Sequence, residues 1–252
     1  MKNKTEILEE LKNWDFAHRG LYDNITSPEN SLSAFRKAVE KGYAIELDVH
    51  LTKDEKLVVV HDSSLKRMSG VELDIEGLTL EESKQYPLLS TSETMPEFKE
   101  VLSLVNGKVP LLVELKVVKN TEKLVDKVME ELDSYDGLYV IESFYPFALK
   151  YLKEKYPEVA RGQLAGNLLK ESKKSSDADI KPYENFLMKN LFVNLISSPD
   201  FVAFKYEDIC LKSFKRYKGY KYTWTVRKYE DYLICKEQGI TPIFEKFDPK
   251  EM

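Results

Sequence analysis

Short apolar runs alternate with amphipathic stretches along most of the chain. Runs of this kind, bounded by polar segments, predict β-strands. The predicted strands cover residues 15–18, 44–51, 57–61, 110–115 and 138–143, with weaker ones at 161–165, 201–206, 221–226 and 240–244.

Helical periodicity separates the predicted strands. It predicts helices over residues 31–41, 96–106, 121–132, 146–155 and 229–238. In the first of these, Asn30 or Ser31 is expected to be the N-cap, and Gly42 lies just past the end. In the second, Pro96 is expected at the first helical position. A short amphipathic helix is also expected within residues 1–15.

Alternation of strands and helices over about 250 residues predicts a parallel α/β fold, with a (β/α)8 TIM barrel the best fit to the length. Five residues separate 44–51 from 57–61, whereas a parallel crossover needs about a dozen. Either this pair forms a hairpin or one candidate is not a barrel strand. Residues 62–95 are read as a small insertion that packs over one end of the barrel, and 170–182 as a polar loop. We expect residues 1–252 to form a single domain.

The composition limits the classes of partner. With 38 Lys+Arg against 43 Asp+Glu, the net charge of −5 argues against general nucleic-acid binding, which needs a basic footprint. A small anionic substrate needs only a local positive charge. No apolar run approaches the ~18 residues of a membrane span, and the N-terminus lacks a signal-peptide stretch. Cys210 and Cys235 fit neither a disulfide framework nor a zinc motif, so we expect reduced thiols in a cytoplasmic protein.

The predicted strand 44–51 (AIELDVHL) carries unusual polar residues. Side chains two apart share a face of a strand, so Glu46, Asp48 and His50 point the same way. Two carboxylates pointing into a barrel mouth repel each other, and burial makes the repulsion worse. A bound divalent cation removes this problem and prefers oxygen ligands. An edge strand with a solvated acidic face is the alternative explanation.

A second acidic strand weakens that alternative. In PLLVELK, Glu114 and Lys116 share a face at the end of an otherwise apolar run. A continuous apolar run indicates a strand that is buried on both sides. Glu114 is therefore a candidate third metal ligand, and Lys116 is a candidate anion contact. A mutual ion pair between the two is the alternative.

The histidines are His18, His50 and His61. His18 and His61 lie at the ends of predicted strands, and strand C-termini are where sites assemble in parallel α/β folds. Arg19 can grip a phosphate through two parallel hydrogen bonds, and Gly20 lets the backbone turn or approach closely. His50 shares the face of the two carboxylates but is not assigned a direct role.

Together these side chains match metal-assisted phosphodiester cleavage better than other reactions. The set comprises two imidazoles, three or four carboxylates, a guanidinium and an ammonium group. A cation and cationic side chains would offset charge on the phosphoryl oxygens. Two histidines could act as base and acid because imidazole titrates near neutrality.

These residues belong to a longer ordered series that resembles the motifs of the glycerophosphodiester phosphodiesterase family. The resemblance spans about residues 17 to 245 and implies a (β/α)8 barrel with a small insertion, in agreement with the pattern above. The matching segments are AHRG (17–20), PENSLSAF (28–35), IELDVHLTKD (45–54), LVVVHD (57–62), LLVELK (111–116), ESF (142–144) and YTWTV (222–226).

The resemblance implies roles for the polar residues. His18 and His61 match the two catalytic histidines of the family. Glu46, Asp48 and Glu114 match its ligands to a divalent metal ion, usually calcium or magnesium. The order in which the two histidines act as base and acid is left open.

Five further positions match binding residues of the family. Arg19 and Lys116 match the cations that contact the phosphate, and Glu29 matches the glutamate of the PEN motif, close to the site. Phe144 and Trp224 match aromatic residues that help to wall the substrate pocket. A place in the hydrophobic core is the alternative for these two aromatics.

The implied reaction is hydrolysis of a glycerophosphodiester to glycerol 3-phosphate and an alcohol, directly or through a cyclic phosphate. A phosphodiesterase acting on a lipid or a polymeric polyol phosphate is an alternative, and so is a non-catalytic barrel that binds polyol phosphates. The sequence departs from the family near its end. Glu245 and Lys246 stand where a Thr-Asp pair is frequent, so the last strand or the pocket edge is expected to differ.

Overall fold

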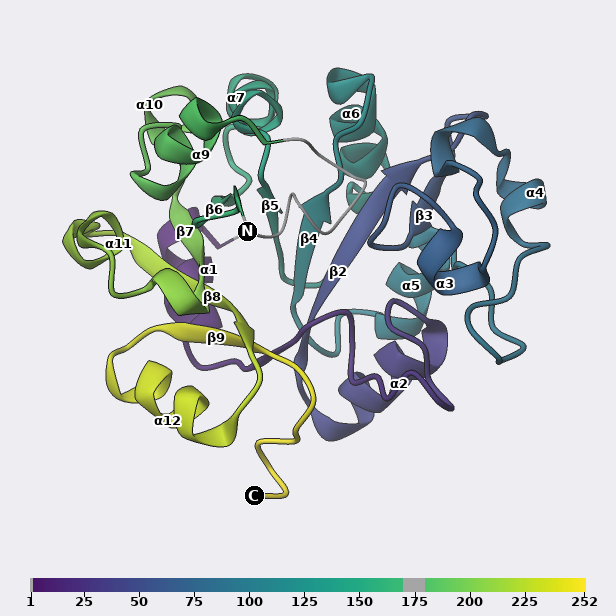
Figure 1. The fold of residues 1–252 in the computed structure, drawn as a ribbon, viewed down its shortest axis with the longest axis horizontal. Coiled ribbons are helices and arrows are strands. Elements are labelled where there is room, and N and C mark those ends of the chain that lie inside the picture. The colour runs from purple at the N-terminus through teal and green to yellow at the C-terminus, as the bar shows by residue number, and fades with distance from the viewer. Residues whose placement is uncertain (1, 170–179) are drawn as a thin grey trace. The chain divides into compact units, whose positions relative to one another are not determined.

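The computed structural model describes residues 2–169 and 180–252 (Figure 1). The chain divides into two compact units. The first unit is Asp15–Tyr139, and the second unit is Met1–Trp14 together with Val140–Met252.

The strands of the first unit flank the long strand β2. β1 and β4 each pair with β2 in parallel, whereas β3 pairs with it in the antiparallel sense, with Val49 opposite Val59. The short connection predicted from the sequence is therefore a hairpin. The bounds are β1 (Phe16–Ala17), β2 (Ala44–Leu51), β3 (Leu57–Val59) and β4 (Leu111–Leu115).

The helices of the first unit include the predicted ones over 31–41 and 121–132. Ser31 is the N-cap of α2, and its side chain accepts a hydrogen bond from the backbone of Ala34. Gly42 ends the same helix in the left-handed conformation. The bounds are α2 (Leu32–Lys41), α3 (Lys66–Ser69), η1 (Ile75–Gly77, a 3-10 helix), α4 (Leu80–Ser83), α5 (Phe98–Val105) and α6 (Thr121–Leu132).

The expected start of α5 was wrong. Pro96 does not open this helix, which begins at Phe98 with Glu97 as its N-cap. The carbonyl of Pro96 instead accepts a hydrogen bond from the backbone of Val59 on β3, at 2.9 Å. Pairing with a strand therefore overrides the helix-starting preference of proline.

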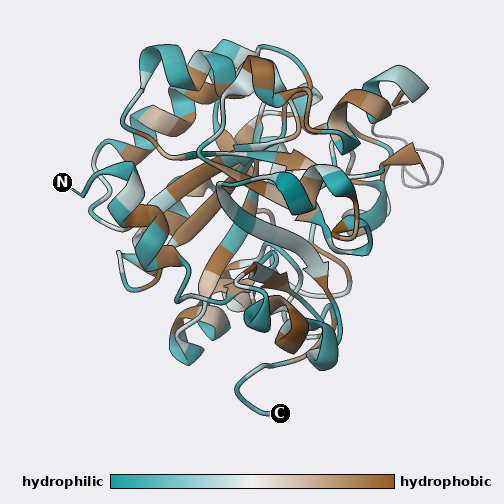
Figure 2. Cartoon of the chain, turned by 90° about the vertical axis from the view of Figure 1, so that its left-hand side faces the viewer, coloured by the Kyte–Doolittle hydropathy of each residue, from teal (hydrophilic) through white to brown (hydrophobic). Residues whose placement is uncertain are grey.

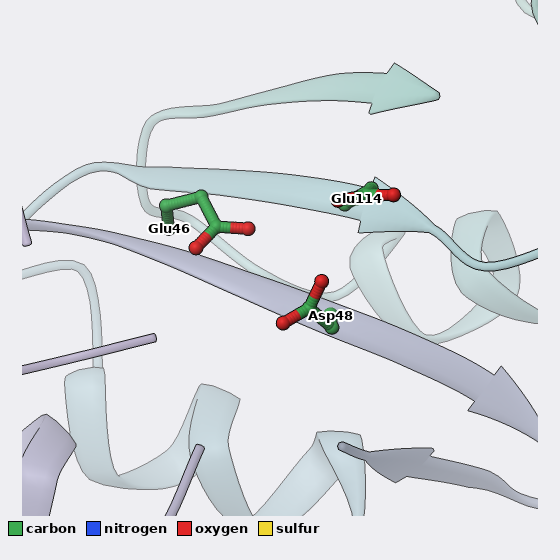
Figure 3. Close-up of side chains that lie close together, drawn as sticks. All are labelled: Glu46, Asp48 and Glu114. Atoms are coloured by element: carbon green, nitrogen blue, oxygen red, sulfur yellow. The ribbon is translucent and has the colours of Figure 1, made fainter. Parts of the chain in front are cut away.

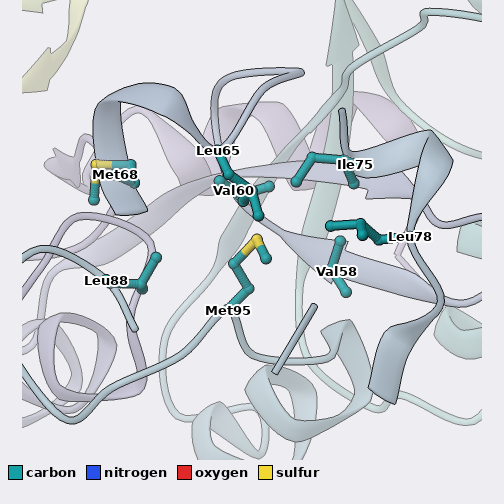
Figure 4. Close-up of a cluster of buried hydrophobic side chains, with 8 residues drawn as sticks. All are labelled: Val58, Val60, Leu65, Met68, Ile75, Leu78, Leu88 and Met95. Carbon is teal, nitrogen blue, oxygen red and sulfur yellow. The ribbon is translucent and has the colours of Figure 1, made fainter. Parts of the chain in front are cut away.

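The insertion, residues 62–95, builds a hydrophobic core of its own against β3 (Figure 4). It contains α3, η1 and α4, which are too short to give a clear periodic signal in the sequence. Burying a large aliphatic side chain contributes roughly 1.5–3 kcal/mol, so this cluster fixes the insertion to the hairpin. Its buried members are Val58, Val60, Leu65, Met68, Ile75, Leu78, Leu88 and Met95.

The strands of the second unit pair in parallel, each with the next one in the sequence. Their positions match the predicted strands to within two residues at each end. The bounds are β5 (Tyr139–Ser143), β6 (Arg161–Ala165), β7 (Phe201–Lys205), β8 (Tyr220–Val226) and β9 (Thr241–Phe244).

Helices lie between the strands of the second unit, and α1 provides the amphipathic helix that was predicted near the N-terminus. Part of the predicted loop 170–182, residues 170–179, lies outside the described residues. The bounds are α1 (Lys4–Leu11), α7 (Pro146–Lys155), α9 (Pro182–Lys189), α10 (Asn194–Ser197), η2 (Tyr206–Asp208, a 3-10 helix), α11 (Lys212–Arg216) and α12 (Tyr229–Glu237).

The two units contain the elements of the predicted (β/α)8 barrel. β1, β2 and β4 belong to the first unit and β5–β9 to the second, and helices separate successive parallel strands. The strands are largely hydrophobic, while the helices mix hydrophilic and hydrophobic residues (Figure 2). Across 2–169 and 180–252, no helix combines the length and hydropathy that a membrane span requires.

Candidate active site

Three carboxylates on two neighbouring strands converge in the first unit (Figure 3). Glu46 and Asp48 lie two residues apart on β2, so they share one face. Glu114 on β4 lies directly opposite Asp48 in the parallel register. One oxygen from each residue lies within 4.8 Å of the others, and all three residues are buried. We call these three residues the acidic cluster.

The acidic cluster already holds one cationic side chain. The Nζ atom of Lys116 lies 2.8 Å from Oε1 of Glu114 and 3.0 Å from Oδ1 of Asp48. The ion pair between Lys116 and Glu114, which the sequence left open, is thus present. Burial nevertheless raises the pKa of Glu114 to about 7, with the Asp48 charge adding to the effect and Lys116 opposing it. At Asp48, burial is outweighed by the positive charges of Lys116 and Arg19, which hold its pKa well below the usual value.

The acidic cluster fits a divalent metal ion. Oδ1 of Asp48 is buried and lies 3.0 Å from Nζ of Lys116, so the acidic cluster already attracts a positive charge. Carboxylate oxygens are the donors that hard divalent cations prefer.

His18 and Arg19 lie beside the acidic cluster because they directly follow β1. Nε2 of His18 lies 3.9 Å from Oε2 of Glu46. The same oxygen accepts a 2.9 Å hydrogen bond from the backbone N–H of Arg19. The turn after β1 therefore places an imidazole and a guanidinium next to one proposed metal ligand.

This turn depends on Gly20, whose φ is +80°. A Cβ atom at this position would lie 2.9 Å from the backbone carbonyl carbon of Ala34 and 2.9 Å from a ring carbon of Phe35. Only glycine combines the left-handed conformation with such close packing on α2. The expectation that Gly20 allows a turn and a close approach is thus met by the geometry.

The guanidinium of Arg19 is oriented by two carboxylates. Its Nη1 donates to Oε1 of Glu29 at 2.5 Å, and its Nε lies 3.5 Å from Oδ2 of Asp48. Glu29 is buried and also receives two hydrogen bonds from Arg67. Burial alone would raise the pKa of Glu29, but Arg67 and Arg19 lower it to about 2. Glu29 is therefore ionised near neutral pH and holds Arg19 in place.

His61 reaches the acidic cluster through the hairpin. Because β3 runs antiparallel to β2, the chain returns beside Asp48, whose carbonyl accepts a hydrogen bond from Val60 at 3.0 Å. The sequence suggested that His61 lies at the C-terminal end of a parallel strand. In the structure His61 instead follows β3, which is antiparallel to β2. The ring of His50, at Nε2, lies 3.1 Å from the carbonyl oxygen of His61.

The ring of His61 is oriented by its neighbour in the sequence. Nδ1 lies 2.6 Å from Oδ1 of Asp62. A proton on Nδ1 that faces a carboxylate leaves Nε2 free to exchange a proton. Burial, with Lys116 and Arg19, lowers the pKa of His61 below its ordinary value, while Asp48 and Asp62 oppose the effect.

Two residues near the acidic cluster were not recognised as site residues from the sequence. Asn30 was one of two candidate helix caps. Ser31 is the cap, and Nδ2 of Asn30 donates to Oδ2 of Asp48 at 2.7 Å. Two adjacent candidate caps could have signalled this, since only one of them can cap the helix. Asp62 belongs to the LVVVHD segment but was not assigned a role. Its position next to a candidate catalytic histidine could have indicated one.

The two predicted pocket aromatics both belong to the second unit. The rings of Phe144 and Trp224 meet edge to face, with centroids 5.4 Å apart. Nε1 of Trp224 donates to the carbonyl of Ala203 at 3.1 Å. Both aromatics are partly buried and pack against a small cluster of Leu168, Met188 and Val193. Their role as a pocket wall stays a prediction.

The departure near the C-terminus has a local structural consequence. Glu245 is buried and accepts a 2.6 Å hydrogen bond from Nε of Arg227. Lys246 adopts a positive φ of 70°. The segment after β9 is therefore held by an ion pair within the second unit.

The elements, together with an acidic cluster that has a histidine and an arginine beside it, fit the class of phosphodiesterases with a (β/α)8 barrel. Residues 18–247 match the Glycerophosphoryl diester phosphodiesterase family. The chain belongs to this family. The match includes most of the first unit, residues Val140 to Phe247 of the second, and every predicted site residue.

Curated relatives agree with this assignment. A glycerophosphodiester phosphodiesterase of Caldanaerobacter subterraneus is 33% identical over 168 residues, which is 61% of this chain and 67% of the relative. One from Bacillus altitudinis is 30% identical over 156 residues, or 57% of this chain and 63% of the relative. The alignments thus span about two thirds of the relatives' length.

Solved structures confirm the fold class. A phosphodiesterase of Oleispira antarctica in complex with sn-glycerol-3-phosphate has a TM-score of 0.76 at 22% identity, covering 96% of each chain. A glycerophosphodiester phosphodiesterase of Thermotoga maritima has a TM-score of 0.66 at 26% identity, covering 92% of this chain and 94% of the other. The fold is the predicted (β/α)8 barrel.

Proposed function

We propose that the protein hydrolyses glycerophosphodiesters to glycerol 3-phosphate and an alcohol with the help of a divalent metal ion. The observation that carries this proposal is the convergence of Glu46, Asp48 and Glu114, with His18 and Arg19 beside them. Membership of the family makes the protein a phosphoric diester hydrolase. The neighbouring structure that contains sn-glycerol-3-phosphate supports the proposed product.

In this proposal Glu46, Asp48 and Glu114 hold the ion, calcium or magnesium. When bound, such an ion polarises the phosphoryl group and offsets charge that develops on its oxygens. Arg19 and Lys116 bind the phosphate, because both cations lie next to the acidic cluster. Their charges stabilise the same oxygens from the protein side.

One of His18 and His61 takes the proton of the attacking hydroxyl group, which belongs to water or to the glycerol moiety, and the other donates a proton to the oxygen of the leaving alcohol. Since Asp62 fixes Nδ1 of His61, this ring exchanges its proton at Nε2. Oriented proton transfer contributes typically 10²–10⁴-fold to a rate. Glu29 keeps the guanidinium of Arg19 in position. Phe144 and Trp224 match the aromatic positions that help to wall the substrate pocket in the family, and we propose the same role for them.

The proposal treats residues 1–252 as one catalytic domain with an insertion at 62–95, since the family match runs through both units. Its partner is a small glycerophosphodiester. The two cysteines, Cys210 and Cys235, are free. A cytoplasmic location stays a prediction.

Hydrolysis of glycerophosphocholine tests the proposal. Purified protein treated with EDTA should be inactive and should regain turnover with calcium or magnesium. The variants His18→Ala and His61→Ala should fold and lose roughly 10²–10⁴-fold in kcat. Tight binding of glycerol 3-phosphate without any turnover by the wild type would instead support a binding barrel. Near-wild-type turnover by either folded variant would remove the two-histidine mechanism.

A lysophospholipid substrate is a second candidate. It is supported by exposed apolar side chains on and after α9, and by rat and human relatives named lysophospholipase D, each 34% identical over about 120 residues. Water-soluble diesters and micellar lysophosphatidylcholine should be compared, with Leu195→Ser as a surface variant. A loss of lipid turnover alone in this variant would favour the second candidate. The exposed side chains include Tyr183, Phe186, Leu187, Phe192 and Leu195.

A further inference from the structure

Arg67 bridges two carboxylates that each orient a different group of the proposed site. Its Nε and Nη2 atoms donate to Oδ2 and Oδ1 of Asp62, at 2.6 and 3.0 Å. Its Nη1 and Nη2 atoms donate to Oε2 and Oε1 of Glu29, both at 2.8 Å. Arg67 was not among the candidate site residues, and it lies in the insertion, on the short helix α3.

The two carboxylates continue this network in opposite directions. Asp62 contacts Nδ1 of His61 at 2.6 Å, and Glu29 accepts a hydrogen bond from Nη1 of Arg19 at 2.5 Å. A continuous chain of charged hydrogen bonds thus joins the candidate catalytic imidazole to the candidate phosphate-binding guanidinium. Arg67 is its midpoint.

We propose that Arg67 is a positioning residue for the hydrolysis, acting through Asp62 on His61 and through Glu29 on Arg19. This inference rests on the proposed function. The insertion thereby contributes to the active site without contacting the substrate. Loss of Arg67 misorients the ring of His61 and leaves Glu29 with Arg19 as its cationic partner among the described residues, which draws that guanidinium away from a phosphate.

The shape of its guanidinium group and the burial of its two partners suit Arg67 to this task. Guanidinium is planar and has five donors in a fixed fork, so it can bind two carboxylates at once, whereas an ammonium group is a compact point charge. The side chain of Arg67 is 44% exposed, but those of Glu29 and Asp62 are only 5% and 16% exposed. The ion pairs therefore differ from screened surface pairs, whose contribution is small.

The backbone of Arg67 is also held firmly. Leu65 and Met68, on either side of it in the sequence, are buried in the hydrophobic cluster of the insertion (Figure 4). Packing of the insertion against β3 thus fixes the origin of the Arg67 side chain relative to the hairpin that carries His61.

Kinetics of Arg67 variants test the inference. Arg67→Ala should lower kcat/KM for glycerophosphocholine by roughly 10–100-fold, mostly through kcat, and Arg67→Lys should lie between it and the wild type. Lys66→Ala is the matched control, because Lys66 pairs only with the exposed Glu72 among the described residues and should leave activity unchanged. Added guanidinium ion should restore part of the kcat of Arg67→Ala but none of that of His61→Ala. Wild-type kcat/KM in folded Arg67→Ala would overturn the inference.

A second readout does not depend on activity. The sequence has only three histidines, so the ring nitrogens can be followed by NMR in protein labelled with ¹⁵N-histidine. Arg67→Ala and Asp62→Asn should both shift the Nδ1 signal of His61, whereas Lys66→Ala should not. An unchanged His61 signal in folded Arg67→Ala, or in Arg67→Lys if the alanine variant does not fold, would also overturn the inference. An inactive wild type would reject the proposed function, while this measurement would still decide the role of Arg67.

Discussion

Asp48 and Glu114 lie directly opposite each other on neighbouring parallel strands, with the ammonium group of Lys116 within 3.0 Å of both carboxylates. Opposed like charges on neighbouring strands are destabilising in the absence of a compensating cation. Lys116 supplies one positive charge, 3.0 Å from Oδ1 of Asp48, for the three carboxylates of the acidic cluster. Stability that depends on a divalent cation is the expected consequence.

Divalent cations should therefore stabilise the folded protein. A ligand that binds only the native state at 100 times its Kd contributes about 2.7 kcal/mol, which corresponds to a rise in Tm of roughly 5–10 °C for a chain of this size. Calorimetry with EDTA, calcium or magnesium should show this rise in the wild type and little of it in Asp48→Asn. Lys66→Ala, which removes an exposed ion pair, should respond like the wild type. An equal response of Asp48→Asn would place the ion elsewhere.

Gly20 should be much less tolerant of substitution than Gly70, a glycine with a similar φ. Gly20→Ala places a Cβ 2.9 Å from the backbone of Ala34, at a φ of +80°. Gly70 has a φ of +75°, and a Cβ atom added there would meet nothing within 4 Å. Gly70→Ala should thus cost only the backbone strain, on the order of 1 kcal/mol. Gly20→Ala should cost at least twice as much in urea unfolding and should also lower kcat, because the turn carries His18 and Arg19.

Equal unfolding free energies for Gly20→Ala and Gly70→Ala would show that α2 can move away from the turn. Unchanged kcat in folded Gly20→Ala would show that the geometry of this turn does not affect the rate of the reaction.

Most of the fold could be predicted from the sequence, because each strand corresponds to a short apolar run that is visible locally. The nine apolar runs correspond to β1–β9, and the short spacing between 44–51 and 57–61 correctly left a hairpin as one option. The helix start at Pro96 was wrong, because a hydrogen bond to Val59 depends on residues 37 positions away. Such pairing leaves no local periodic trace.

The site was predicted less completely, for a related reason. The carboxylates of β2 could be predicted because they alternate with apolar residues within one strand. The contacts of Asn30 with Asp48, and of Arg67 with Glu29, join residues that are 18 and 38 positions apart. Whether a polar side chain caps a helix, lies in solvent or supports a site is decided by these distant partners, which one sequence does not reveal.

Glu29 should make the folded protein sensitive to acid. Its pKa is lowered to about 2 from an ordinary value of 4.5. An acid with a lowered pKa in the folded state stabilises the fold above the unfolded pKa, and this contribution disappears as the pH falls through the folded pKa. The contribution should therefore be complete above about pH 5 and should fade between about pH 4.5 and 2.

Comparison of the wild type with Glu29→Gln measures this contribution. Near pH 7 the variant should be less stable by roughly 2–4 kcal/mol, since Arg19 and Arg67 lose a buried partner, and the difference should shrink toward pH 2–3. Glu72→Gln, on an exposed partner of Lys66, provides a control with little effect at any pH. A difference for Glu29→Gln that does not vary with pH would indicate a packing defect in place of a lost charge.

The pH dependence of hydrolysis tests the two imidazoles as proton carriers. A base that must be neutral and an acid that must be protonated give a bell-shaped profile of kcat/KM. The environment of His61 lowers its pKa, so with His61 as the base the rate falls on the acidic side of the profile, where this ring gains a proton. The carboxylate of Asp62 stabilises the protonated ring of His61. The variant Asp62→Asn should therefore lower the pKa of His61 further and move the acidic limb of the profile to lower pH. Because the pKa of His61 is lowered to about 3, the rates need to be measured from about pH 2.5 to 9 at saturating metal. A profile that stays flat over this whole range would mean that neither histidine transfers a proton in the rate-limiting step.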